Sequence, residues 1–223
     1  MCDPRLLQKD LRDGTYIVTG ANSGAGLATA RQLASQGARV IAACRRVDAG
    51  QQAFADMGPV GGSVKVMELD LGSLASVRRF AEAFTQEFDR LDGLANNAGI
   101  MAVPEGRTED GFERQFGVNY LGHFLLTELL LDTLKTSAPS RVACVSSVMH
   151  TGGRRGPVPN LHLDDLNWEQ RAYDRNEAYG ESKLAVVLGA SHLARRLEGT
   201  GVSAFSIQPG WVRSNLAAGM MPG

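Results

Sequence analysis

Two residues whose side chains could exchange a proton lie four positions apart in the stretch AYGESKLAVV, residues 178–187. Tyr179 and Lys183 would share one face of a helix, because residues four apart on a helix are neighbours. A phenol has a pKa of about 10 on its own, and both an adjacent ammonium and an oxidised nicotinamide favour the phenolate. We therefore expect Lys183 to lower the pKa of Tyr179 and to make it a general acid or base.

The elements that must position this pair are visible as short β-branched runs alternating with longer helical patterns, which is typical of repeated βαβ units. We expect an α/β fold with a doubly wound, Rossmann-type parallel sheet whose ligand crevice lies at the carboxyl ends of the strands. The expected strands cover residues 15–19, 39–44, 64–69, 91–95, 141–146 and 202–207, and the expected helices cover roughly 24–36, 48–57, 73–88, 110–135 and 176–198.

Composition narrows the class of protein. The 223 residues, which we expect to form a single domain over 1–223, carry a formal net charge of −1, so no basic field favours nucleic acid as a partner. Cys2, Cys44 and Cys144 are odd in number and far apart, which argues against disulfides and structural zinc. We see neither a signal peptide nor an integral membrane segment, and expect a soluble cytoplasmic protein.

The segment 150–175 has neither a strand nor a helix pattern and is rich in Gly, Pro, Asp and Arg. A loop this long in a compact fold is usually functional or disordered, and because it precedes Tyr179 it could wall a substrate site. The four histidines have no metal or triad spacing, so no metal site is expected. His123 lies in an apolar helix pattern and is expected to be a packing residue. His150 and His162 flank the long loop, where a binding role stays open.

Three glycines follow the first expected strand and precede a helix pattern. Gly20, Gly24 and Gly26 would allow a tight turn and a close approach of the backbone to a pyrophosphate at the helix N-terminus. Glycines also close ordinary loops, so the turn alone leaves both interpretations open.

The chain resembles the short-chain dehydrogenase/reductase family through six motifs in the same order. The matching residues are Thr19, Gly20, Gly24 and Gly26 of T-G-x-x-x-G-x-G; Asn96, Asn97, Ala98 and Gly99 of N-N-A-G; Asn119; Ser147; Tyr179 and Lys183 of Y-x-x-x-K; and Pro209 and Gly210. The resemblance implies that Tyr179, Lys183, Ser147 and Asn119 are catalytic. It also implies that Lys183 binds the nicotinamide ribose and that Asn119 holds a water in a proton relay.

The resemblance implies a further set of cofactor-binding residues along the chain. These are Gly20, Asn22, Ser23, Gly24, Gly26, Leu27, Arg45, Asp70, Leu71, Asn97, Ala98, Gly99, Tyr179, Lys183, Pro209, Gly210, Val212 and Ser214. Asp70 resembles the aspartate that bonds the adenine amine, and Ser214 stands where a threonine is usual.

The second expected strand ends in the sequence ACRR, which bears on the choice of cofactor. A carboxylate at this position would accept from the ribose 2′-hydroxyl of NAD, whereas an arginine accommodates a 2′-phosphate. Cys44 is not an acid, and Arg45 with Arg46 supplies forked donors that suit a phosphate. We therefore expect NADP(H). The alternative is that the arginines only solvate a strand end, an interpretation that suits Arg46 better than Arg45.

Two adjacent serines end the fifth expected strand. Alternation along a strand places Ser146 and Ser147 on opposite faces, so only one can face Tyr179. Alignment with the family assigns the substrate-orienting hydroxyl to Ser147 and leaves Ser146 a structural residue.

Within the family, the segments ACRR, NYLGHFLLTELLL, VSSVMH, DLNWE and YGESKLAVVL most resemble the retinol-dehydrogenase-like branch, and LLLDTLK has some similarity to light-dependent protochlorophyllide reductase. This implies a small lipophilic alcohol, aldehyde or ketone as substrate, with a retinoid as one candidate. Family members usually continue past P-G with a lid and a seventh strand, but this sequence ends at NLAAGMMPG. A second hypothesis is therefore a catalytically impaired NADP(H)-binding regulatory or interaction module. Family members commonly dimerise through the helices expected at 110–135 and 176–198, which leaves a homodimer open.

Overall fold

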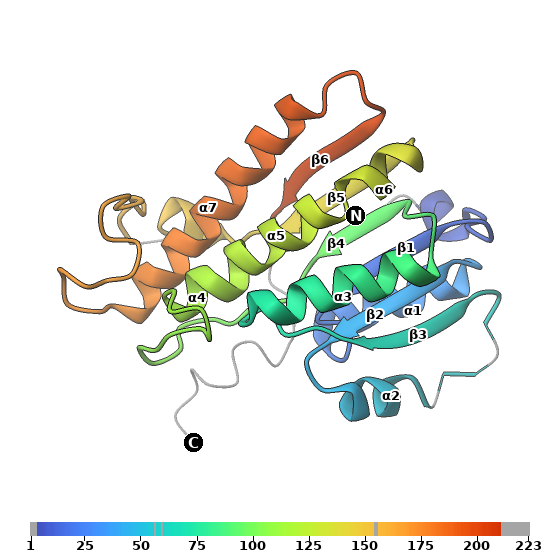
Figure 1. The fold of residues 1–223 in the computed structure, drawn as a ribbon, viewed down its shortest axis with the longest axis horizontal. Coiled ribbons are helices and arrows are strands. Elements are labelled where there is room, and N and C mark those ends of the chain that lie inside the picture. The colour runs from blue at the N-terminus through green and yellow to red at the C-terminus, as the bar shows by residue number, and fades with distance from the viewer. Residues whose placement is uncertain (1–3, 56, 59, 154–155, 211–223) are drawn as a thin grey trace.

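The computed structural model describes residues 4–55, 57–58, 60–153 and 156–210. Six strands form one sheet in the order β3-β2-β1-β4-β5-β6, with every neighbouring pair parallel (Figure 1). The strands are β1 (Thr15–Thr19), β2 (Arg39–Cys44), β3 (Ser63–Glu68), β4 (Gly93–Asn96), β5 (Ser140–Val145) and β6 (Val202–Ile207). The strand order reverses between β1 and β4, and this reversal opens a crevice at the carboxyl ends of these two strands.

Helices cover both faces of the sheet. Successive apolar residues of a strand point to opposite faces, so each face has an apolar surface to bury. Ile17 and Ile41 pack with α3 and α5, whereas their neighbours Val18 and Val40 pack with α1. The helices are α1 (Gly24–Ser35), α2 (Val47–Ala55), α3 (Leu74–Glu87), α4 (Arg114–Phe116), α5 (Gly122–Leu129), α6 (Leu131–Thr136) and α7 (Arg175–Arg196). Short helical turns lie at η1 (Pro4–Gln8), η2 (Gly117–Leu121) and η3 (Val148–Thr151). The expected doubly wound α/β fold is confirmed.

The predicted helix over 110–135 is wrong at its start and in its interior. Gly111 has a φ of 86°, and the helix begins only after Glu113, whose carboxylate accepts hydrogen bonds from the first backbone N–H groups. The segment η2 then has π-helical geometry, and Leu130 separates α5 from α6 with a ψ of 3°. Single π-helical turns inside α-helices are frequent at functional sites, and η2 contains Asn119.

The long segment between β5 and α7 contains η3 and then runs without regular structure to Asp174 as far as it is described, in agreement with the expected loop. It lies beside α4 at the end of the molecule where the strands have their carboxyl ends (Figure 1). In the part of the chain that the structure describes, no helix combines the length and the apolar character needed to cross a membrane.

Candidate active site

The tyrosine and the lysine of the opening motif lie together near the start of α7. Asp174 caps this helix by accepting hydrogen bonds from Asn176 N and Glu177 N. Tyr179 and Lys183 are each 3% exposed, and the ammonium Nζ lies 5.8 Å from the centroid of the phenol ring. Lys183 Nζ also donates to Val145 O at the end of β5, over 2.9 Å. The two side chains therefore share one face of α7, as their spacing predicted.

The expected effect of Lys183 on Tyr179 is wrong for the protein alone. Burial raises the pKa of Tyr179 above its usual value, and a hydrogen bond with Ser147 opposes this rise only in part. Burial also lowers the pKa of Lys183, to about 8. Low-dielectric surroundings disfavour the charged form of each group, and for Tyr179 this effect exceeds that of the hydrogen bond with Ser147. At neutral pH the pair is therefore a protonated phenol beside a buried ammonium.

The two serines after β5 separate as the strand alternation predicts. Ser147 makes the hydrogen bond with Tyr179, and its hydroxyl also accepts from Met149 N at the start of η3. Ser146 is buried, and its hydroxyl donates to Lys183 O over 2.9 Å. Ser147 thus faces the phenol, whereas Ser146 fastens the backbone of α7 to the sheet.

Asn119 lies in the π-helical turn η2 and is 1% exposed. Its Oδ1 accepts from Ile100 N over 2.9 Å, and its Nδ2 donates to Ile100 O and to the hydroxyl of Ser182. That hydroxyl donates to Tyr179 O over 2.7 Å. Asn119 therefore joins the chain after β4 to the turn of α7 that carries Tyr179. Ser182, three residues after Tyr179, was not among the predicted site residues.

The glycine turn after β1 brings the start of α1 close to the end of that strand. A Cβ on Gly26 would lie 2.4 Å from Gly20 O and 2.5 Å from Asn97 Nδ2, so only glycine allows α1 to approach the end of β1. Gly20 itself has a φ of 65°. Ser23 is the N-cap residue of α1, but its side chain makes no capping hydrogen bond in the described structure. The N–H groups of the first turn remain available, which suits an anion at this helix terminus.

The turns after β1 and β4 are joined by the hydroxyl of Thr19. It accepts from Asn97 N and Ala98 N, each over 2.9 Å, and lies 2.9 Å from His123 Nε2. His123 Nδ1 lies 3.0 Å from Asn119 O. A carbonyl can only accept, so Nδ1 carries the hydrogen and Nε2 accepts from the threonine. His123 is a satisfied packing residue, as expected, and in addition connects the cofactor turn to Asn119, a link that no sequence spacing indicated.

The remaining predicted cofactor residues lie along the carboxyl edge of the sheet. Asn22 lies within the glycine turn and Leu27 follows it. A Cβ on Gly99 would lie 3.1 Å from Asn119 Oδ1 and 3.5 Å from Lys183 Nζ. Pro209 and Gly210 follow β6 and are exposed. Val212 and Ser214 lie outside the described residues.

Arg45 and Arg46 follow β2 directly and are exposed. Neither guanidinium has a hydrogen bond or ion pair with another side chain in the described part of the chain. Asp70, after the adjacent strand β3, accepts from Gly72 N through Oδ1, and Leu71 is buried. The ends of the neighbouring strands β2 and β3 therefore carry two exposed arginines and a carboxylate, respectively.

Comparisons with known proteins give the class of protein that this fold and site define. Residues 15–158 match the family model described as short chain dehydrogenase. The chain belongs to the short-chain dehydrogenase/reductase family. It is 48% identical to human retinol dehydrogenase 13 over 204 residues, which are 91% of this chain and 60% of that protein. It is 50% identical to human retinol dehydrogenase 12 over 90% of this chain and 62% of that protein. These similarities place it in the retinol-dehydrogenase-like branch; it spans about three fifths of the length of these relatives.

Solved structures agree with the fold. A crystal structure of an uncharacterised protein from Mycobacterium paratuberculosis has a TM-score of 0.82 and 46% sequence identity, covering 95% of this chain and 73% of that one. An NADP complex of RhlG from Pseudomonas aeruginosa has a TM-score of 0.74 and 28% identity, covering 94% of this chain and 77% of that one.

We predict that His123 makes folding stability depend on pH. Burial lowers its pKa from 6.5 to about 4. Above the unfolded value the ring is neutral in both states and contributes no pH dependence. As the pH falls from 6.5 to 4, the unfolded chain takes up a proton that the folded chain excludes, so the fold should lose up to about 3 kcal/mol. Urea denaturation across this range measures the loss.

The variant His123→Gln should show a shallower decline in stability over the same pH range, whereas the exposed control His192→Gln should follow the wild type. Equal slopes for His123→Gln and the wild type would contradict the prediction.

Proposed function

We propose that this protein is an NADP(H)-dependent oxidoreductase that interconverts a lipophilic alcohol and its aldehyde or ketone. One observation carries the proposal: Tyr179, Lys183, Ser147 and Asn119 lie at one end of the sheet, next to a glycine turn with free N–H donors. A protein that only bound the cofactor would have no need of all four of these side chains together.

The cofactor would lie along the carboxyl edge of the sheet. The N-terminus of α1 and the turn from Gly20 to Gly26 would hold its pyrophosphate. Asp70 would receive the adenine amine, and Arg45 the 2′-phosphate. Lys183 would bond the nicotinamide ribose. The bound nicotinamide supplies hydride for reduction or accepts it in oxidation.

The residues of the chain would handle the proton. In reduction, Tyr179 would donate its hydroxyl proton to the carbonyl oxygen of the substrate while Ser147 orients that oxygen; in oxidation, Tyr179 would take the alcohol proton. The raised pKa of Tyr179 keeps the phenol protonated at neutral pH, which suits the reducing direction. Lys183 would then stabilise the phenolate left behind, and Asn119 would hold a water that returns a proton to it.

Similarity to retinol dehydrogenases supports a small lipophilic substrate, with a retinoid among the candidates. A cytoplasmic location is part of the proposal, since Cys44 and Cys144 are free thiols, the form that a reducing compartment maintains.

We predict that Tyr179→Phe lowers NADPH-dependent reduction of an apolar aldehyde about 10²- to 10⁴-fold, because the substrate oxygen loses its proton donor. The Kd for NADPH should stay close to that of the wild type. The control Tyr16→Phe removes the same hydroxyl from the opposite end of β1 and should keep full activity. Cofactor binding without turnover in the wild type would instead favour an impaired binding module.

We predict that Arg45→Ala raises the Kd for NADPH about tenfold and leaves the Kd for NADH unchanged, because hydrogen bonds to the 2′-phosphate are lost. Arg46→Ala should have a smaller effect. Fluorescence titration of Arg45→Ala, Arg46→Ala and the wild type with NADPH and with NADH measures these Kd values. Equal affinity of the wild type for NADPH and NADH would contradict the choice of cofactor.

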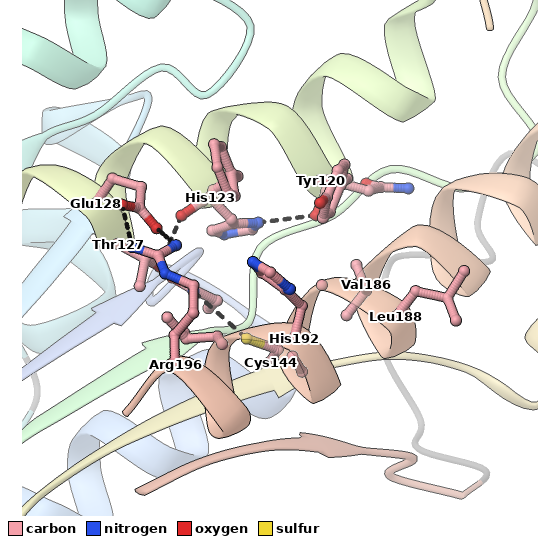
Figure 2. A pocket seen from close by; sticks show the side chains of 15 residues that line it. Tyr120, His123, Thr127, Glu128, Cys144, Val186, Leu188, His192 and Arg196 are labelled. Atoms are coloured by element: carbon pink, nitrogen blue, oxygen red, sulfur yellow. Dashed lines mark hydrogen bonds and ion pairs between the residues drawn. The ribbon is translucent and has the colours of Figure 1, made fainter. Parts of the chain in front are cut away.

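We further propose that the protein forms a homodimer across α5 and α7. A cavity of about 260 Å³ lies between these helices, walled by Tyr120, His123 and Val186 among others (Figure 2). Phe124 and Leu188, which also line it, are 44% and 52% exposed. Exposed apolar side chains around a cavity are typical of a surface that binds another protein. In a two-fold dimer the same surface of each copy forms the interface, so Phe124 and Leu188 of one copy would pack on this face of the other.

We predict that Leu188→Asp converts the dimer to a monomer in light scattering, because a charge would be buried at the interface. The control Leu6→Asp changes an exposed leucine in η1 and should leave the dimer intact. A wild-type chain that is monomeric at micromolar concentration would contradict the proposal.

A further inference from the structure

Two consecutive residues of α7, Gly180 and Glu181, are covered by the long segment that precedes this helix. A Cβ on Gly180 would lie 2.8 Å from Pro159 Cγ and 3.1 Å from Met149 O. Glu181, the next residue, is only 2% exposed. The segment therefore lies directly on the helical turn that carries Tyr179.

The buried carboxylate of Glu181 is held by one arginine of this segment. Arg171 donates to both of its oxygens, over 2.6 Å and 2.9 Å. The guanidinium carbon of Arg171 also lies 3.5 Å from the ring centroid of Trp168, which is 5% exposed and has a φ of 58°. Arg171 Nε donates to Asp165 over 3.3 Å. Stacking and a two-pronged ion pair are geometries that arginine provides and lysine does not.

The same segment is fastened on its other side to the chain around α4. Asn167 Oδ1 accepts from Glu113 N over 2.9 Å, and the Tyr173 hydroxyl donates to Glu113 Oε1 over 3.0 Å. Gln115 donates to the Tyr173 hydroxyl and accepts from Ala102 N, which lies just after the N-N-A-G turn. The loop 162–174 thus bridges α7 and the end of β4, across the edge where Figure 1 shows loop and α4 side by side.

Two acidic side chains of α7 beneath this loop are paired with the same arginine. His162, Glu177 and Glu181 place potential ligand atoms within 4.8 Å of one another. Arg171 forms ion pairs with both carboxylates, at 3.5 Å and 2.6 Å. One guanidinium therefore joins the loop to two carboxylates of α7, and we call the Arg171–Glu181 ion pair, with its stacking on Trp168, the clamp.

We propose that Arg171 is a positioning residue: stacked on Trp168 and paired with Glu181, it holds the loop 162–174 as a preformed wall of the site for a bulky lipophilic substrate. This inference rests on the proposed function. Without the guanidinium, Glu181 would be a buried carboxylate that has lost its main partner, which is strongly unfavourable. The turn would then open toward water, and the loop would lose its fixed position against the first turns of α7.

The KM values of Arg171→Ala for substrates of different size test whether the loop 162–174 forms a wall of the substrate site. The KM for a bulky lipophilic ketone should rise about tenfold, whereas the KM for a short aliphatic aldehyde and the Kd for NADPH should change little. Guanidinium chloride at millimolar concentration should restore the low KM by filling the space over Trp168, and Arg171→Lys should restore it only in part. The control Arg195→Ala removes the same charge from the far end of α7 and should match the wild type.

An equal rise of KM for both substrates, or a fall in kcat with unchanged KM, would overturn the proposal. Glu181→Gln keeps the shape and one hydrogen bond of the clamp and should raise the KM for the bulky ketone to a lesser extent. It serves as the test if Arg171→Ala does not fold.

Hydrogen exchange separates failure of the clamp from failure of the proposed function, because it needs no turnover. Arg171→Ala should accelerate amide exchange in residues 162–174 and leave β1 and α1 unchanged, and guanidinium should reverse the change. Unaltered exchange in the loop would overturn the clamp even in an active enzyme. An inactive wild-type chain with the expected exchange would overturn the oxidoreductase assignment and, with it, the substrate wall, but not the clamp.

Discussion

The ammonium of Lys183 is a full charge that is almost completely buried. The protein must therefore supply hydrogen-bond acceptors in place of water, and this requirement constrains the surrounding structure. Burial lowers the pKa of Lys183 to about 8, so at neutral pH the charge persists and must be met by the protein. Val145 O at the end of β5 accepts one hydrogen bond from it over 2.9 Å. This contact requires the carboxyl end of β5 to lie under the first turns of α7. The position of Tyr179, one turn earlier, follows from the same contact.

The parallel sheet makes that arrangement available because all its strands end at one edge. Three of the site's segments follow β1, β4 and β5 directly, so they meet without long excursions of the chain. The hydroxyl of Thr19 then fixes the separation of two of them by accepting from Asn97 N and Ala98 N. The ring of His123 links the hydroxyl of Thr19 to Asn119 O by two further hydrogen bonds. The glycine turn and Asn119 are therefore parts of one hydrogen-bond network.

Two buried carboxylates extend the same principle to the loop 162–174. Glu113, 1% exposed, is compensated by backbone N–H groups at the start of α4 and by the hydroxyl of Tyr173. Glu181 is compensated by the guanidinium of Arg171. An intact buried ion pair adds little to stability, because desolvation offsets the attraction. Removing one partner is strongly destabilising, because the other charge is left buried without compensation. Such groups contribute less to stability than to the definition of one geometry, and here they define where the loop 162–174 lies.

The local alternation of apolar residues and the glycine turn were enough to predict the fold, because both act over a few neighbouring positions. The pairing of Tyr179 with Lys183 was equally predictable, since one helical turn brings them together. The direction of the pKa shift of Tyr179 was not, because it depends on burial by segments distant in sequence. The same holds for the π-helical turn at Asn119 and for the clamp by Arg171, whose partners no spacing reveals. Sequence determined which groups are present and which share an element; only tertiary packing decided how far water is excluded from them and which charges must meet.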